Sequence, residues 1–144
     1  MKKYITDDFL YFSMWAAAFL ATAGSLYLSE VLKYVPCTLC WYQRIFMYPL
    51  TVIMTIMLIK KQFNLLQIAI LASIGWIIAA YHYAIQMIPS AESLSFCGMG
   101  SCSGKYIDWF GFITIPFMSL VAFSIILLGC IVSKKMAEGE HAHA

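Results

Sequence analysis

Two pairs of cysteines are the residues in this sequence whose type and spacing point most directly to chemistry. Cys37 and Cys40 form a CxxC motif at the start of a long apolar segment, and Cys97 and Cys102 are separated by four residues, two of which are glycines. Residues three apart share one face of a helix, and the exposed N–H groups of a first helical turn favour a thiolate. Cysteines in one compartment can pass a disulfide between pairs by thiolate attack. The pairs therefore predict thiol–disulfide exchange.

Two other interpretations of these cysteines stay open. A CxxC motif can be half of a zinc site, which would make the chain a metal-binding or sensory membrane protein. The segment from Cys97 to Cys102 can also be a structural disulfide that closes a loop. We favour redox chemistry without a metal site, and we expect Cys37–Cys40 and Cys97–Cys102 disulfides in the resting protein. The fifth cysteine, Cys130, is expected to be a buried structural residue.

Three polar residues in apolar surroundings are candidates for binding a cofactor. Arg44 follows Cys40 by four residues, and its charge could stabilise a low-pKa thiolate on Cys40 or a reduced quinone oxygen. His82 and Gln86 are four apart and could exchange a proton with such an oxygen and donate a hydrogen bond to it, or they could only bond across helices. The sequence has no haem, flavin or iron–sulfur motif. A membrane quinone, menaquinone or ubiquinone, is therefore the expected electron acceptor.

The composition indicates that these residues are held by membrane helices. The chain has 144 residues, of which 62% are hydrophobic and 11% charged, and its mean hydropathy is +0.82. Four apolar segments are each about 20 residues long, enough to cross a bilayer, and none alternates as a barrel strand would. These segments are 9–29, 39–59, 65–88 and 110–132. Short connections then predict an all-α, up-down-up-down four-helix bundle in contact with membrane lipid.

Charged residues predict the orientation of this bundle. Paired lysines flank the first, second and fourth apolar segments, and the positive-inside rule places them on the cytoplasmic side. These pairs are Lys2 and Lys3, Lys60 and Lys61, and Lys134 and Lys135. Both termini are thus expected in the cytoplasm, with the cysteine loops facing outward. We expect residues 1–136 to form one domain and residues 137–144 to be a disordered or appended tail. The net charge of +2 gives no reason to expect nucleic-acid binding.

Four motifs spread over this predicted bundle resemble those of one membrane enzyme family. They are PCTLCWYQR at 36–44, YHYAIQMIP at 81–89, CGMGSCSG at 97–104 and IDWFGFITIP at 107–116. With these motifs the chain resembles the DsbB/BdbC family of quinone-dependent thiol–disulfide oxidoreductases, and within it the short BdbC-like members of Gram-positive bacteria. A vitamin K epoxide reductase-like enzyme would share the helix and cysteine arrangement, but the local motifs of this chain fit that family less well.

The resemblance implies a function and roles for individual residues. The protein would reoxidise an extracytoplasmic thioredoxin-like dithiol oxidase at the bacterial cytoplasmic membrane and pass the electrons to a quinone, which supports disulfide formation in secreted proteins. Cys97 would form the mixed disulfide with the partner, and Cys102 would attack Cys37 and release Cys40 as the thiolate facing the quinone. Arg44 would lie beside that thiolate. Gram-negative members separate the second cysteine pair by a much longer loop than the four residues found here.

Overall fold

The computed structural model describes residues 2–33, 37–88 and 115–143, with side chains from residue 7 to residue 139 within these ranges. This part of the chain forms four helices and no strand: α1 (Lys2–Glu30), α2 (Thr38–Lys60), α3 (Leu65–Met87) and α4 (Ile115–His143). All four are long and apolar enough to cross a membrane. The predicted all-α membrane fold is confirmed.

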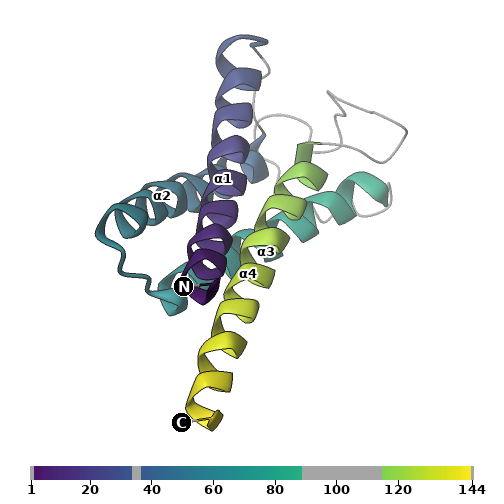
Figure 1. Ribbon diagram of the computed structural model, residues 1–144. Coiled ribbons are helices and arrows are strands. Elements are labelled where there is room, and N and C mark those ends of the chain that lie inside the picture. Colours follow the sequence, from purple (N-terminus) through teal and green to yellow (C-terminus); the bar gives the residue numbers. More distant parts are fainter. Residues whose placement is uncertain (1, 34–36, 89–114, 144) are drawn as a thin grey trace.

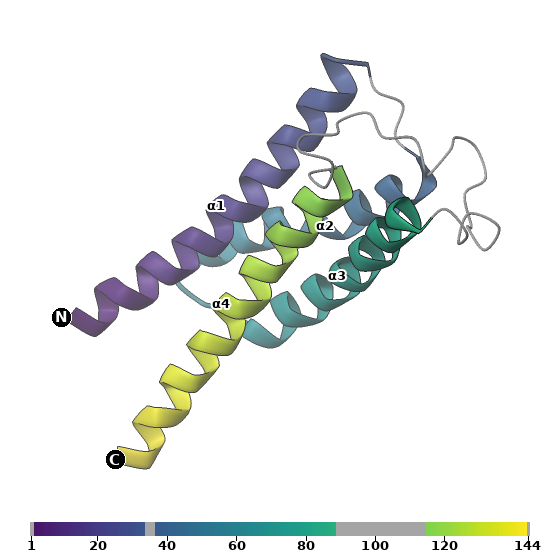
Figure 2. The ribbon, with the colours of Figure 1, turned by 90° about the vertical axis from the view of Figure 1, so that its right-hand side faces the viewer.

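The four helices form a ring in which each contacts the next. α1 packs against α2 and α4, and α3 packs against the same two helices. In Figure 1, α1 and α4 run alongside each other, whereas α2 and α3 cross them obliquely. The chain reverses direction at each connection, and both termini lie at the same end of the molecule (Figure 2). The N-terminus of α2, where the CxxC motif begins, lies at the other end.

Small residues allow close contact between the helices in the core. A Cβ atom on Gly75 of α3 would collide with the ring of Phe123 on α4, and one on Gly129 of α4 would collide with the side chain of Met14 on α1. Phe123 and Met14 are themselves buried. Both glycines are therefore positions where a neighbouring side chain takes the space that a Cβ would need, as is common between membrane helices.

Side-chain hydrogen bonds also join neighbouring helices in the described part of the chain. Among them are Trp15 Nε1 to Thr55 Oγ1 at 2.8 Å, the hydroxyls of Thr22 and Thr51 at 2.9 Å, and Trp76 Nε1 to Ser124 Oγ at 2.9 Å. The first two link α1 to α2, and the third links α3 to α4. Polar contacts of this kind contribute to helix association in a bilayer, where apolar surface alone gives little preference for protein over lipid.

The outer surface of the helices is strongly apolar. Phe9, Leu20, Ile59 and Leu66 expose 70% or more of their side chains, and they come from the first three helices. Apolar exposure on this scale is unfavourable in water but matches the hydrocarbon core of a bilayer. The protein is therefore a multi-pass membrane protein.

Within the described residues, two helix boundaries differ from the sequence prediction by more than one residue, and the predicted start of the fourth helix at residue 110 lies outside them. α1 begins at Lys2 and not at residue 9, and α4 continues to His143 and not to residue 132. The stretch 137–143, expected to be a disordered or appended tail, is thus helical. Its neighbourhood is rich in Ala, Met, Lys and Glu, which favour helices, and Lys134 lies 3.7 Å from Glu138 one turn later. Hydropathy marks the membrane-spanning part of a helix, and residues of high helix propensity extend it beyond that part.

Candidate functional site

The CxxC motif lies where α2 begins. Cys37 is the N-cap residue, with extended backbone angles of φ −71° and ψ 168°, and its carbonyl accepts the N–H of Trp41 at 3.1 Å. Cys40 is one turn further on, and the two sulfur atoms lie 3.2 Å apart. Both cysteines are free thiols, although we expected them to be joined in the resting protein. The predicted shared face is confirmed, and the structure describes the reduced form of the pair.

His82 of α3 brings an imidazole ring to this pair. Its side chain is 1% exposed, and its Nε2 atom lies 3.5 Å from the sulfur of Cys37. Cys37 is also buried, and it packs with Leu39 and Ile85 in a small apolar cluster that includes Cys40. The histidine was predicted to face a quinone together with Gln86. The structure places it against the first cysteine of the motif, a contact that the sequence did not predict.

Gln43 completes this group and was not assigned a role from the sequence. It is 5% exposed, and its side-chain nitrogen lies 3.1 Å from Nδ1 of His82. Because an amide N–H donates, Nδ1 accepts and the proton of the neutral ring is on Nε2, directed toward Cys37. The available signal was a polar residue within a transmembrane segment, three positions after Cys40, since polar residues at membrane depth commonly have specific partners.

The surroundings of Cys37 favour its thiolate. The hydrogen bond with the Cys40 side chain lowers the pKa of Cys37 most, burial opposes this effect, and the hydrogen bond from His82 lowers the pKa further. The net result is a pKa well below the ordinary value for a thiol. The spacing of Arg44 and Cys40 predicts a low-pKa thiolate on Cys40, whereas the lowered pKa at the motif belongs to Cys37.

Arg44 is held between α2 and α1. Its guanidinium group donates a hydrogen bond to the carbonyl of Ser25 at 3.0 Å and lies 5.7 Å from the centroid of the Trp41 ring. A guanidinium group has five N–H donors, so this bond leaves others for a ligand. Gln86 is half-buried one turn after His82 on α3. These residues stay candidates for cofactor binding, and Cys37, Cys40 and His82 also have the donor atoms of a metal site.

Of the remaining three cysteines, the structure describes Cys130 alone. Cys97 and Cys102 lie outside the described residues, so their predicted pairing stays a prediction. Cys130 is a free thiol, 6% exposed, in the main apolar core with residues of all four helices. Its predicted burial is confirmed.

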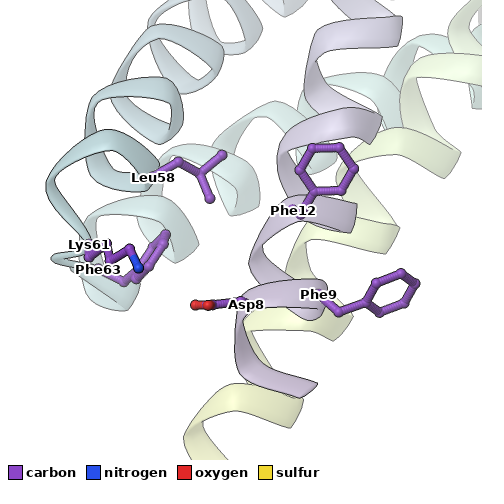
Figure 3. A pocket seen from close by; sticks show the side chains of 6 residues that line it. All are labelled: Asp8, Phe9, Phe12, Leu58, Lys61 and Phe63. Atoms are coloured by element: carbon purple, nitrogen blue, oxygen red, sulfur yellow. The ribbon is translucent and has the colours of Figure 1, made fainter. Parts of the chain in front are cut away.

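A pocket between α1 and the C-terminal end of α2 lies far from the CxxC motif. Its volume is about 440 Å³, and Figure 3 shows the side chains that line it, from Asp8, Phe9 and Phe12 on one side and Leu58, Lys61 and Phe63 on the other. At a rise of 1.5 Å per residue, Leu58 is roughly 30 Å along α2 from the CxxC motif. This pocket is therefore not part of the site formed by the cysteines.

Comparison with known proteins assigns the chain to a family. The family model described as "Disulfide bond formation protein DsbB" matches residues 7–133. The chain is 48% identical over 125 residues to "Probable disulfide formation protein C 1" of Bacillus cereus, covering 85% of this chain and 90% of the relative. It is 46% identical over 130 residues to "Disulfide bond formation protein C" of Bacillus subtilis, covering 89% and 92% of the two chains.

A third relative extends the match over nearly the whole chain. The "SPbeta prophage-derived disulfide bond formation protein B" of Bacillus subtilis is 40% identical over 146 aligned residues, which cover 98% of this chain and 97% of the relative. No solved structure matches the chain. The family match includes α2 and α3 in full, most of α1 and of α4, and the group formed by Cys37, Cys40, Gln43 and His82. The chain therefore belongs to the DsbB family of disulfide bond formation proteins.

Proposed function

We propose that this membrane protein oxidises an extracytoplasmic thioredoxin-like dithiol protein and passes the electrons to a membrane quinone. Membership of the DsbB family makes it a thiol–disulfide oxidoreductase of disulfide formation. The observation that carries the proposal is the 3.2 Å separation of the Cys37 and Cys40 sulfurs beside a buried histidine. A pair held in this way can alternate between dithiol and disulfide.

The geometry of the pair supports this alternation. A disulfide requires a sulfur separation of about 2.05 Å, so the two sulfurs must approach by roughly 1 Å to form the bond. Cys40 is half-buried and Cys37 is buried. Both belong to the first turn of α2 or its N-cap, so that the helix restrains their backbone from one side only. Side-chain rotation about the two Cα–Cβ bonds is enough for a change of this size.

His82 and Gln43 act on the sulfur of Cys37 in the proposed reaction. The family resemblance implies attack on Cys37 with release of Cys40, but the lowered pKa of Cys37 and its contact with His82 favour the opposite order in this proposal. The disulfide is attacked at Cys40, and Cys37 leaves as a thiolate that accepts a hydrogen bond from the Nε2–H of His82. A thiol of low pKa is the better leaving group in such an exchange. Gln43 keeps the ring in the required tautomer, since it donates to Nδ1.

The proposed cycle balances two electrons and two protons. The partner dithiol loses both as its own disulfide forms, and the Cys97–Cys102 disulfide is reduced to a dithiol. That dithiol reduces the Cys37–Cys40 disulfide in turn through a mixed disulfide. Reoxidation of Cys37 and Cys40 closes the cycle, and a bound quinone supplies the acceptor for the two electrons and two protons.

Residues near Cys40 fit a quinone by their donor chemistry. Arg44 lies one turn after Cys40, and its guanidinium group can donate to a carbonyl oxygen while it keeps its bond to Ser25. Trp41 is exposed beside it and offers an aromatic surface toward the lipid. In this proposal Arg44 would hold a quinone oxygen and Gln86 of α3 would supply a further polar contact. His82, predicted from the sequence to share this role, instead has both ring nitrogens engaged by Gln43 and Cys37.

The charge distribution supports an orientation with the cysteines outside the cytoplasm. Lys60, Lys61, Lys134 and Lys135 are exposed and lie near the ends of α2 and α4 opposite the CxxC motif. The positive-inside rule places that end, and with it both termini, in the cytoplasm. The CxxC end then faces the oxidising side of a bacterial cytoplasmic membrane, where disulfides persist.

The proposal is tested by turnover of the full chain in lipid nanodiscs. The protein is mixed anaerobically with a soluble quinone and a reduced thioredoxin-like protein, and quinol formation is followed by absorbance. We expect turnover with the native chain and with Cys130→Ala, whose cysteine is remote from the motif, and none with Cys40→Ala. Equal turnover of Cys40→Ala and the native chain would refute the role of the cysteine pair. Absence of turnover with menaquinone and ubiquinone analogues would refute a quinone as the electron acceptor.

A further inference from the structure

Three metal-ligating atoms converge at the start of α2. The sulfurs of Cys37 and Cys40 and a ring nitrogen of His82 all lie within 4.8 Å of one another. Two thiolates and an imidazole are a ligand set that zinc accepts, with a fourth position left for water. We propose that the reduced Cys37–Cys40 pair and His82 bind one Zn²⁺ ion, and that this ion and the Cys37–Cys40 disulfide exclude each other.

The interatomic distances fit a tetrahedral zinc ion after small movements. Zn–S bonds of 2.3 Å and Zn–N bonds of 2.0–2.1 Å place two sulfurs about 3.8 Å apart, and a sulfur and a nitrogen about 3.6 Å apart. The Cys37 sulfur is already 3.5 Å from Nε2 of His82. The two sulfurs, at 3.2 Å, must separate by roughly half an ångström. Only the half-buried Cys40 side chain has to move appreciably.

The charge of the ligands also favours a divalent cation at this site. Cys37 and His82 are buried, and two thiolates without a counter-charge would be costly there. A divalent cation neutralises them, so that the occupied site carries no net charge. Each thiol that still holds a proton releases it to solvent as the ion binds.

Gln43 supplies the support that a metal-bound histidine usually has. A histidine that binds zinc through one nitrogen commonly donates its other N–H to a neighbouring acceptor. Gln43 already lies 3.1 Å from Nδ1, and rotation of its amide by half a turn presents an oxygen that accepts this N–H. The same residue therefore fits the metal-bound and the metal-free ring.

Zinc and the disulfide compete for the same two sulfur atoms. A disulfide uses both sulfurs at about 2.05 Å and leaves no thiolate to bind a metal. The oxidised protein should therefore not bind at this site, and bound zinc should protect the pair from oxidation. The proposal needs only a pair that can be reduced. It does not depend on transfer of electrons to a quinone.

The test uses the full chain carrying Cys97→Ser, Cys102→Ser and Cys130→Ser, so that Cys37 and Cys40 are its only thiols. After reduction by a phosphine and removal of the reductant, Cd²⁺ is added in metal-free buffer and the ultraviolet cadmium–thiolate band is recorded. Zn²⁺ should displace Cd²⁺, and X-ray absorption of the zinc form should show sulfur at about 2.3 Å and nitrogen at about 2.0–2.1 Å. Zn²⁺ should also slow oxidation of the pair by diamide.

Variants of the polar residues separate this site from simple thiol binding. Gln43→Leu should weaken binding about 10- to 100-fold, as loss of a residue that orients a metal-bound histidine commonly does. His82→Gln, which keeps a polar side chain and is checked for helix content, should weaken it further. No cadmium band in the reduced protein, an equal band in the oxidised protein, or affinity unchanged by His82→Gln would each overturn the proposal.

Discussion

Nδ1 of His82 lies 3.1 Å from the side-chain nitrogen of Gln43, and this contact determines which ring nitrogen faces the cysteines. Because Nδ1 accepts from the amide, the proton of the neutral ring is on Nε2, which lies 3.5 Å from the sulfur of Cys37. A residue of α2 thus orients a histidine of α3 toward a sulfur at the start of α2. The chemistry of the pair therefore depends on how these two helices pack, and the packing can be tested by mutation.

Reactivity of Cys37 should persist at acidic pH. A lowered pKa means that the thiolate is fully present at pH values near the ordinary thiol pKa and is lost only as the pH falls through the lowered value. His82→Phe removes one donor to this thiolate. A hydrogen bond to a charged group contributes about 1.5–3 kcal/mol. The half-point, which is the pH at which Cys37 reacts at half its maximal rate, should therefore rise by about one to two pH units.

This shift is measured by the rate of alkylation of Cys37 in the reduced protein, with the label located by mass spectrometry. Tyr42→Phe, on an exposed position of α2, serves as the control because it leaves both the sulfur and the imidazole in place. If the half-point of the native chain lay near 8.5, the value of an ordinary thiol, the environment described here would not act on Cys37.

Loss of Gln43 should destabilise the protein. Gln43→Leu leaves Nδ1 of a fully buried imidazole without its donor, which costs about 1–3 kcal/mol. Gln62→Leu changes the same residue type in the exposed turn between α2 and α3 and should have little effect. The free energy of unfolding in mixed micelles compares the two. Equal values for both variants would mean that the contact between Gln43 and His82 contributes no stability.

Two glycines of the membrane helices should respond in opposite ways to the same substitution. Gly75→Ala places a methyl group against the ring of Phe123 and should destabilise by about 1–3 kcal/mol, while Gly24→Ala has open space and should gain up to about 1 kcal/mol from helix propensity. The Phe123→Leu change should restore part of the stability of Gly75→Ala. Thermal unfolding of the four variants measures this, and an additive double mutant would contradict the close contact.

Arg44 should affect quinone affinity more than folding. Arg44→Met removes the donor proposed for a quinone oxygen and should raise the KM for quinone about 10- to 100-fold, the equivalent of a hydrogen bond to a charged group. Arg44→Lys keeps the charge but presents its donors in a different geometry, so its KM for quinone should lie between those of the native chain and Arg44→Met. Steady-state kinetics at saturating dithiol gives these values, and an unchanged KM in Arg44→Met would place the quinone elsewhere.

The sequence predicted the architecture well because membrane helices have a strong local signature. Apolar length alone located α2 and α3 to within one residue at each end. The same signal missed the first turns of α1 and the end of α4, where polar residues continue a helix beyond the apolar segment. Helix propensity, not hydropathy, governs those turns.

The site was predicted less completely, and the reason is geometric. Spacing along one helix placed Cys37, Cys40 and Arg44 on related faces, because positions three or four apart are neighbours. The contact between His82 and Cys37 depends on how far α3 is shifted and rotated relative to α2, which no periodicity encodes. Gln43 was overlooked for the same reason, since its partner lies 39 positions away in the chain.

The most direct test of the account is a single turnover of the reduced CxxC pair with quinone. The full chain carrying Cys97→Ser and Cys102→Ser is reduced, freed of reductant and mixed rapidly with a soluble quinone under anaerobic conditions. We predict one quinol for each chain, together with a new disulfide joining Cys37 and Cys40 in the peptide map. Quinol formation without that disulfide, or a reduced pair that stays reduced in the presence of quinone, would contradict the proposed transfer.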